Sequence, residues 1–159
     1  MMFLAACDKD NDDDNRLNST DQMFITQVNI GNRAEVMAGQ LAANKGTNPL
    51  VRDFGNHMVM EHSQAQAELQ TIASNLGMAL ADTVDAEHRA LMARLNALSG
   101  YSFDTAYMNS QVKDHQKTVS IFQMELSGGN NQAVRNYASN KLPHIQMHLQ
   151  RADSIARVL

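Results

Sequence analysis

The stretch NPLVRDFGNHM (residues 48–58) returns in altered form as NQAVRNYASNK (residues 131–141), 83 residues further along the chain. Each copy begins with an asparagine that can cap a helix, continues to Val-Arg, and then places an aromatic residue where a helix would face its core. Pro49 suits the first position of a helix, where no backbone N–H is needed. The chain is therefore expected to contain one helical unit twice.

Apolar residues spaced three and four apart extend this pattern outward from both copies. They predict long helices near 21–45, 49–76, 102–127 and 131–157, with Ser102 as the cap of the third. The stretch 78–101 is too long for a tight turn, and its leucines predict a short helix near 85–98. Two helical hairpins joined by such a crossover are typical of a ferritin-like four-helix bundle, so the expected fold class is all-α.

Composition and charge agree with one helical domain and argue against nucleic-acid binding and against a membrane-spanning segment. The chain has 159 residues, no Trp and only 5% aromatic residues, which favours helices over sheets. Its net charge of −4 is misleading, because five acidic residues and one Lys lie in residues 1–14 and the rest is balanced. A balanced domain without a basic stripe argues against nucleic-acid binding. No apolar run approaches the length of about 20 residues that a membrane span needs.

The N-terminal residues indicate export to the cell envelope. Leu4-Ala5-Ala6-Cys7 resembles a bacterial lipobox, whose cysteine becomes the lipidated first residue of the mature protein. We expect residues 1–6 to end a signal peptide that starts upstream, 7–19 to be an acidic tether, and 20–159 to be the folded domain. Lipidated Cys7 would anchor the domain to the inner or outer membrane, facing the periplasm or the cell surface. The alternative is a free thiol after a chance apolar run.

The chain also resembles a bacterial ferritin-like family, domain of unknown function 4142, over about residues 21–157. The matching motifs are Ala34-Glu35, MVMEH at 58–62, KDH at 113–115, and Leu142-Pro143 followed by His148. The resemblance implies a four-helix domain of the cell envelope, secreted or lipid-anchored. It implies no reaction.

Candidate metal ligands lie at one height in the predicted bundle. A rise of about 1.5 Å per residue, counted from the turns, brings one residue of each long helix to its middle: Glu35, His62, His115 and His144. His148 follows His144 by four residues, so both project from one helix face, as ligands on metal-binding helices do. Imidazole suits zinc or copper. We assign no role to His57 and expect it at the surface.

A second interpretation needs no metal. Buried imidazoles can form a polar network with Glu35 that fixes the register of the helices. The domain would then be a non-catalytic binding or structural module of the envelope without a cofactor, and zinc or copper binding is the alternative function. A ferritin-like metal oxidase is disfavoured, because its site needs Glu-x-x-His on two helices and the sequence lacks this motif. Phosphate-binding loops and nucleophile motifs of enzymes are absent from the sequence as well.

The remaining charged and histidine residues near these candidates are expected to point elsewhere. Glu61 and Asp114 each precede a candidate histidine, but neighbouring residues lie about 100° apart around a helix. Both carboxylates are therefore expected to reach a neighbouring helix or solvent. His88 is expected at the surface and is assigned no role.

Overall fold

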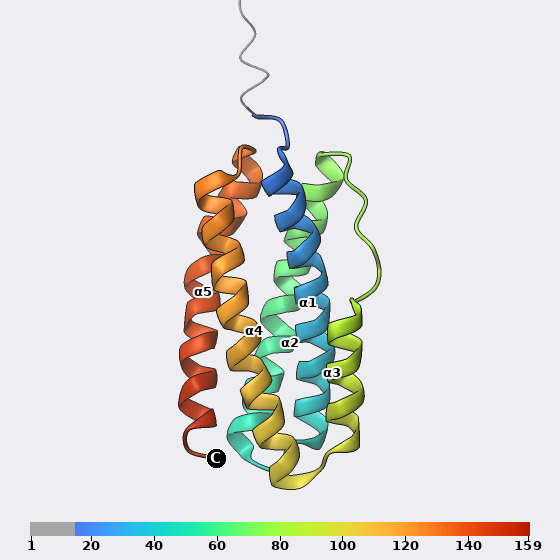
Figure 1. Cartoon of the computed structure of the whole chain (residues 1–159), viewed down its shortest axis with the longest axis vertical. Coiled ribbons are helices and arrows are strands. Elements are labelled where there is room, and N and C mark those ends of the chain that lie inside the picture. Colours follow the sequence, from blue (N-terminus) through green and yellow to red (C-terminus); the bar gives the residue numbers. More distant parts are fainter. Residues whose placement is uncertain (1–14) are drawn as a thin grey trace, which may run out of the picture.

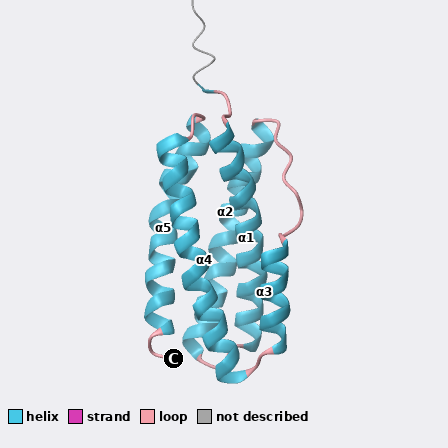
Figure 2. Cartoon of the chain, in the orientation of Figure 1, coloured by secondary structure: helices cyan, strands magenta, loops and turns pink. Residues whose placement is uncertain are grey.

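The computed structural model describes residues 15–159, which form five helices and no strand (Figures 1 and 2). The helices are α1 (Ser19–Lys45), α2 (Pro49–Asn75), α3 (Ala86–Ala97), α4 (Gly100–Gly128) and α5 (Gln132–Ala156). Every predicted helix is confirmed, with each end within two residues of its expected place. Cys7 and most of the predicted tether lie outside the described residues. None of the helices among residues 15–159 combines the length and the apolar character needed to cross a membrane.

The four long helices lie side by side as two antiparallel hairpins, α1–α2 and α4–α5 (Figure 1). Helices α2 and α4 run in the same direction, so the chain between them has to return along the length of the bundle. It does so through residues 76–99, where α3 packs on the outside against α1 and α4. The predicted crossover with a short helix is therefore confirmed.

The two repeated stretches start their helices as expected. The side chain of Asn48 accepts a hydrogen bond from the Leu50 backbone N–H (2.9 Å), and that of Asn131 accepts from the backbone of Ala133 (3.0 Å). The expected Ser102 cap is wrong. Helix α4 begins at Gly100 because this glycine adopts a φ of +59°, which turns the chain into the helix two residues earlier.

A carboxylate from each hairpin holds the turn of the other. Asp104 on α4 accepts hydrogen bonds from the backbone N–H groups of Thr47 (3.0 Å) and Asn48 (2.8 Å) in the α1–α2 turn. Asp21 on α1 accepts from the N–H groups of Asn130 (3.0 Å) and Asn131 (3.1 Å) in the α4–α5 turn. The two aspartates are again 83 residues apart. This spacing supports the interpretation of the chain as a repeated unit.

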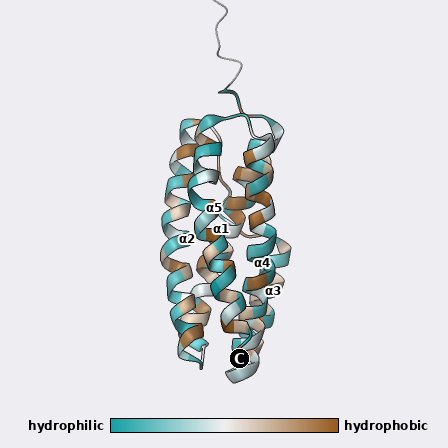
Figure 3. Cartoon of the chain, turned by 90° about the vertical axis from the view of Figure 1, so that its left-hand side faces the viewer, coloured by the Kyte–Doolittle hydropathy of each residue, from teal (hydrophilic) through white to brown (hydrophobic). Residues whose placement is uncertain are grey.

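The core consists of two apolar clusters with a polar layer between them. One cluster, at the end with the α1–α2 turn, includes Phe54, Phe103 and Tyr107. The other, at the end with the α4–α5 turn, includes Phe24 and Phe122, whose rings meet edge to face at 4.9 Å. Figure 3 shows hydrophobic positions interleaved with hydrophilic ones along the long helices. The buried polar layer consists of Asn32, Glu35, His62, Gln111, His115 and His148.

Glu125, near the Asp21 brace, provides a test of stability against pH. Burial, and then the neighbouring Asp21 carboxylate, raise the pKa of Glu125 to about 8 from 4.5 in an unfolded chain. The folded state thus prefers the neutral acid, so its contribution to stability is complete below pH 4.5 and is lost as the pH rises through about 8.

We expect the free energy of unfolding to fall by about 2 kcal/mol or more between pH 5 and pH 8.5, because one pKa unit corresponds to about 1.4 kcal/mol and the pKa of Glu125 is raised to about 8 in the folded protein. Glu125→Gln keeps the shape of the neutral acid and should remove most of this slope. Urea denaturation of both proteins across this pH range measures it. An equal slope in both proteins would exclude Glu125 as its source.

Candidate metal centre

Three buried histidines from three helices converge in the polar layer. The ring centroids of His62 on α2, His115 on α4 and His148 on α5 lie 5.4 to 5.8 Å apart. One ring nitrogen from each can be chosen so that all three atoms lie within 4.8 Å of one another. At most 4% of the surface of any of these residues is exposed. The described residues thus include a His group that could hold a metal ion.

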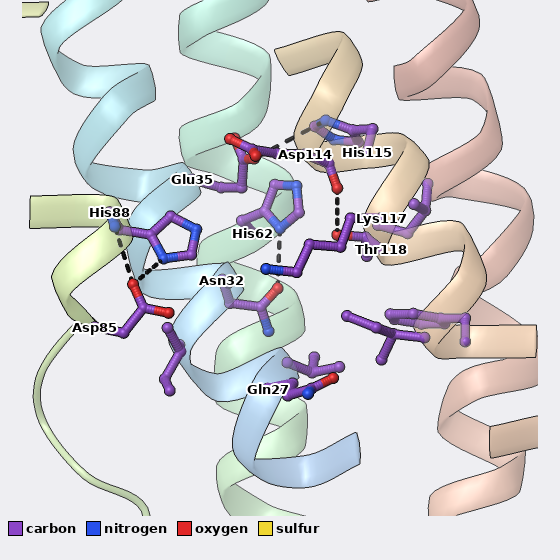
Figure 4. Close-up of a pocket in the computed structure, with 16 residues that line it drawn as sticks. Gln27, Asn32, Glu35, His62, Asp85, His88, Asp114, His115, Lys117 and Thr118 are labelled. Atoms are coloured by element: carbon purple, nitrogen blue, oxygen red, sulfur yellow. Dashed lines mark hydrogen bonds and ion pairs between the residues drawn. The ribbon is translucent and has the colours of Figure 1, made fainter. Parts of the chain in front are cut away.

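A hydrogen bond through Nδ1 orients the ring of His62 and leaves Nε2 without a partner among the described residues. Its Nδ1 lies 2.9 Å from the side-chain oxygen of Asn32 (Figure 4). The Asn32 amide nitrogen donates toward the Gln66 side-chain oxygen and the Tyr137 hydroxyl, each at 3.4 Å, which fixes the amide orientation. His62 Nδ1 therefore carries the proton and donates. Its Nε2 is buried and has no hydrogen-bond partner among the described residues.

His115 has the same arrangement, and His148 has more freedom. His115 Nδ1 lies 2.9 Å from the Gln111 backbone carbonyl, which can only accept, so Nδ1 donates and Nε2 is left without a partner among residues 15–159. Neither ring nitrogen of His148 has a hydrogen-bond partner there. Histidines that bind metals are commonly held in this way, through an oxygen acceptor on one nitrogen while the other nitrogen faces the ion.

All three rings are neutral at neutral pH. Burial lowers the pKa of His115 to about 4 and that of His148 to about 3. Burial also lowers the pKa of His62 well below its usual range, and repulsion from the neighbouring imidazoles lowers it further. Neutral imidazole is the form that binds metals, so no proton has to be displaced from these nitrogens.

Glu35 lies in the same layer but on the other side of His115. Its Oε1 lies 3.9 Å from His115 Nδ1, the nitrogen already used by Gln111, and its Oε2 is buried without a hydrogen-bond partner among the described residues. Burial raises the pKa of Glu35 to about 7. In Figure 4 Glu35 lies above His62 at the pocket that both residues line. The structure does not bring its carboxylate into the group of three histidines.

His144 lies outside the buried group, in a second cluster around Glu61. Its Nδ1 is 3.2 Å from Glu61 Oε2, and its side chain is 49% exposed. The same Glu61 oxygen lies 3.4 Å from His148 Nε2, and Glu61 Oε1 lies 3.8 Å from His57 Nε2. The expectation that Glu61 would reach a neighbouring helix is confirmed. His57, Glu61 and His148 form the second group that could hold a metal ion.

Sequence reasoning missed the roles of His57 and Glu61 in this second cluster. The signal available was their spacing of four residues, which puts both on one face of α2, as His144 and His148 lie on one face of α5. His88, expected at the surface, is partly buried: its side chain is 15% exposed, and its Nδ1 lies 2.7 Å from the Asp85 carboxylate.

Two cavities lead to the buried histidines from different sides. One, of about 120 Å³, lies among α1, α4 and the start of α3, and its lining includes His62, His115, His88 and Asp114 (Figure 4). The other, of about 150 Å³, lies largely between α2 and α5, and its lining includes Glu61. Both volumes exceed the roughly 15 Å³ that one water molecule needs. The three histidines therefore lie between two openings.

Comparison with known proteins gives a family and a fold. A family model described as domain of unknown function (DUF4142) matches residues 7–155. No match was found among curated proteins. The structure is similar to the crystal structure of a DUF305 fragment from Deinococcus radiodurans, with a TM-score of 0.80 and 11% sequence identity. The similarity covers 91% of this chain and 99% of that fragment, and at this identity it shows a shared fold.

Proposed function

Because the chain belongs to the DUF4142 family, whose description names no activity, we propose its function from the site: the protein binds a zinc or copper ion through His62, His115 and His148. Two observations carry this proposal: each of the three buried rings has a nitrogen without a hydrogen-bond partner among residues 15–159, and one nitrogen from each ring lies within 4.8 Å of the others. Imidazole nitrogen is a preferred ligand of both metals.

The competing interpretation, a polar network that fixes helix register, explains these atoms less well. A register network should pair its buried nitrogens, because each unpaired buried polar atom costs about 1 to 3 kcal/mol. Asn32 pairs one nitrogen of His62, and the Gln111 carbonyl pairs one nitrogen of His115. The other nitrogen of each ring has no partner among residues 15–159. A bound ion would satisfy all three rings together. The sequence favoured the network, and the unpaired nitrogens favour the ion.

Three histidines leave part of the coordination sphere of zinc for another ligand. Zinc with three protein ligands commonly takes water in its fourth position. The cavities beside His62 have room for such a water molecule. The described residues place no thiolate in the site. A site of three imidazoles suits both zinc and copper, so the ligands do not identify which of the two metals is bound.

The cellular location and the architecture of the protein are part of the same proposal. Cys7 would carry the lipid that anchors the domain in the cell envelope, and the Asp-rich residues after it would hold the domain away from the membrane. Two hairpins joined by a long crossover support a ferritin-like bundle. The metal oxidase chemistry of ferritins is not proposed, because Glu-x-x-His is absent from the sequence.

Metal-dependent thermal stability tests the proposed function. A ligand that binds only the folded state stabilises it by about 2.7 kcal/mol when its free concentration is about 100 times its dissociation constant. We expect zinc or copper to raise the unfolding temperature of the purified protein, and a chelator to reverse the rise. His115→Ala and His62→Ala should lose this metal-dependent rise, whereas His88→Ala should keep it.

The comparison within each variant, with and without metal, separates lost binding from lost stability. Elemental analysis of protein purified without chelator gives an independent measurement. The proposal fails when neither ion shifts the unfolding temperature of the unsubstituted protein and neither is retained on purification.

A further inference from the structure

The Glu61 carboxylate lies among three imidazoles at the gap between α2 and α5. Its Oε2 lies 3.2 Å from His144 Nδ1 and 3.4 Å from His148 Nε2, and its Oε1 lies 3.8 Å from His57 Nε2. The first two histidines come from α5, and His57 stands one turn before Glu61 on α2. A carboxylate with several imidazoles is a ligand set that suits divalent transition metals.

Exposure falls step by step from this cluster to the core. The side chain of His144 is 49% exposed, that of His57 is 32% and that of Glu61 is 28%, whereas that of His148 is only 3%. An ion in solution can therefore reach Glu61 and His144 directly. It can reach the buried histidines only after it has passed them or has crossed another part of the bundle.

His148 lies midway between the outer cluster and the buried one. Its ring centroid is 5.4 Å from that of His57 on the outside, and 5.5 Å and 5.4 Å from those of His62 and His115 on the inside. It belongs to both groups whose ligand atoms lie within 4.8 Å of one another. Its ring nitrogens are buried and have no hydrogen-bond partner among residues 15–159, so either group can use the ring.

A passage joins the two groups. The cavity of about 150 Å³ is lined by Glu61 and His144 at its outer part and by His62 and His148 at its inner part. Helices α2 and α5 also pack against each other less closely than the two helices of either hairpin do. The walls of the other cavity are more apolar and include the charged residues Asp85, Asp114 and Lys117, whereas those of this cavity include Glu61 and Lys141.

We propose that His57, Glu61 and His144 form an outer metal-binding site that captures divalent ions from solution and passes them, through His148, to His62 and His115. This proposal rests on the proposed function. The ion keeps its charge and oxidation state, and only its ligands change: the outer oxygen and nitrogens are replaced one at a time by the inner nitrogens. The negative charge of Glu61 beside a low-dielectric interior raises the local concentration of cations and with it the rate of capture.

Kinetics distinguish an uptake site from a ligand of the final site. A site that the ion only passes through speeds the entrance and the exit of the ion by the same factor. Loss of such a site therefore slows both uptake and release and leaves the affinity of the protein for the ion unchanged. Co²⁺ serves as the probe, because its visible absorption changes with the number and kind of its ligands. Uptake is followed by rapid mixing of the full-length protein with Co²⁺, release by mixing the loaded protein with a chelator, and affinity by titration with Co²⁺ and Zn²⁺.

We expect Glu61→Gln to slow uptake and release by about tenfold, which is the lower end of the effect of electrostatic focusing on association rates. His144→Ala should slow both as well, by a smaller factor because the carboxylate remains. The matched control is Glu68→Gln, the same change two turns along the same helix, where the carboxylate pairs with Lys141 at 2.7 Å. It should take up Co²⁺ at the rate of the unsubstituted protein.

Two results overturn the uptake site and leave the proposed function standing. In one, both variants take up Co²⁺ at the unsubstituted rate. In the other, affinity falls while the uptake rate is unchanged, which would make Glu61 and His144 ligands of the final ion. Failure of the unsubstituted protein to bind Co²⁺ or Zn²⁺ overturns the uptake site for these ions, and failure to bind copper as well overturns the proposed function.

Discussion

Gly55→Ala is expected to destabilise the protein by about 3 kcal/mol or more, because it inserts a methyl group between two helix backbones. The backbones of helices α1 and α2 are in close contact where Gly39 faces Gly55. A Cβ at Gly55 would lie 2.7 Å from the Gly39 backbone oxygen and 2.9 Å from the Ala43 backbone nitrogen. A backbone atom cannot turn aside as the end of a side chain can. The two helices would have to separate, and the layer that holds His62 would loosen with them.

Gly31→Ala is the matched control on α1. A Cβ at Gly31 meets nothing within 4 Å. The substitution should therefore stabilise the protein by about 0.5 to 1 kcal/mol, the usual gain when alanine replaces glycine inside a helix. Urea denaturation of the three proteins measures both effects. Equal stability of Gly55→Ala and the unsubstituted protein would show that the close approach of the backbones is not needed.

Asp104→Ala is expected to cost about 4 kcal/mol, because it leaves several buried donors without an acceptor. The Asp104 carboxylate accepts the backbone N–H groups of Thr47 and Asn48 and the Thr47 hydroxyl, and the residue is only 1% exposed. These bonds tie the start of α4 to the turn between α1 and α2. Their loss removes the acceptor that orders this turn and joins one hairpin to the other.

Two further variants separate this brace from a general effect of removing charge. Asp104→Asn keeps one acceptor oxygen and should fall between the unsubstituted protein and the alanine variant. Asp53→Ala removes an exposed carboxylate from α2 near the same end of the bundle and should change stability by no more than about 0.5 kcal/mol. Chemical denaturation again measures the differences. A similar cost for Asp53→Ala and Asp104→Ala would contradict the role of the brace.

The helices could be predicted because their signals are local. Caps, glycine and proline breakers, and apolar residues three and four apart are read along one segment without knowledge of the others. The repeated stretches carried this information twice, and their caps at Asn48 and Asn131 form as expected. The start of α4 was misplaced because a serine and a glycine both signal a helix boundary, and the glycine at position 100 takes the left-handed conformation.

The candidate site could be predicted only in part. A constant rise per residue gave the height of His62 and His115, and a spacing of four gave the shared face of His144 and His148. Height does not specify direction around the helix axis. Glu35 consequently lies near Nδ1 of His115, which already bonds to the Gln111 carbonyl, and His144 points to the outer cluster.

The sequence by itself determined the helix boundaries to within two residues, the two hairpins, the crossover and the set of histidines near the middle of the bundle, since each depends on spacing within one segment. Only the tertiary structure decided that His62, His115 and His148 converge and that Glu61 and His57 form a second cluster beside them. The physical reason is that contact between helices depends on their rotation and separation. These are set by distant groups, namely the Gly39–Gly55 approach and the braces of Asp21 and Asp104. The free ring nitrogens likewise depend on partners that no local pattern reveals, the Asn32 amide across the α1–α2 hairpin above all.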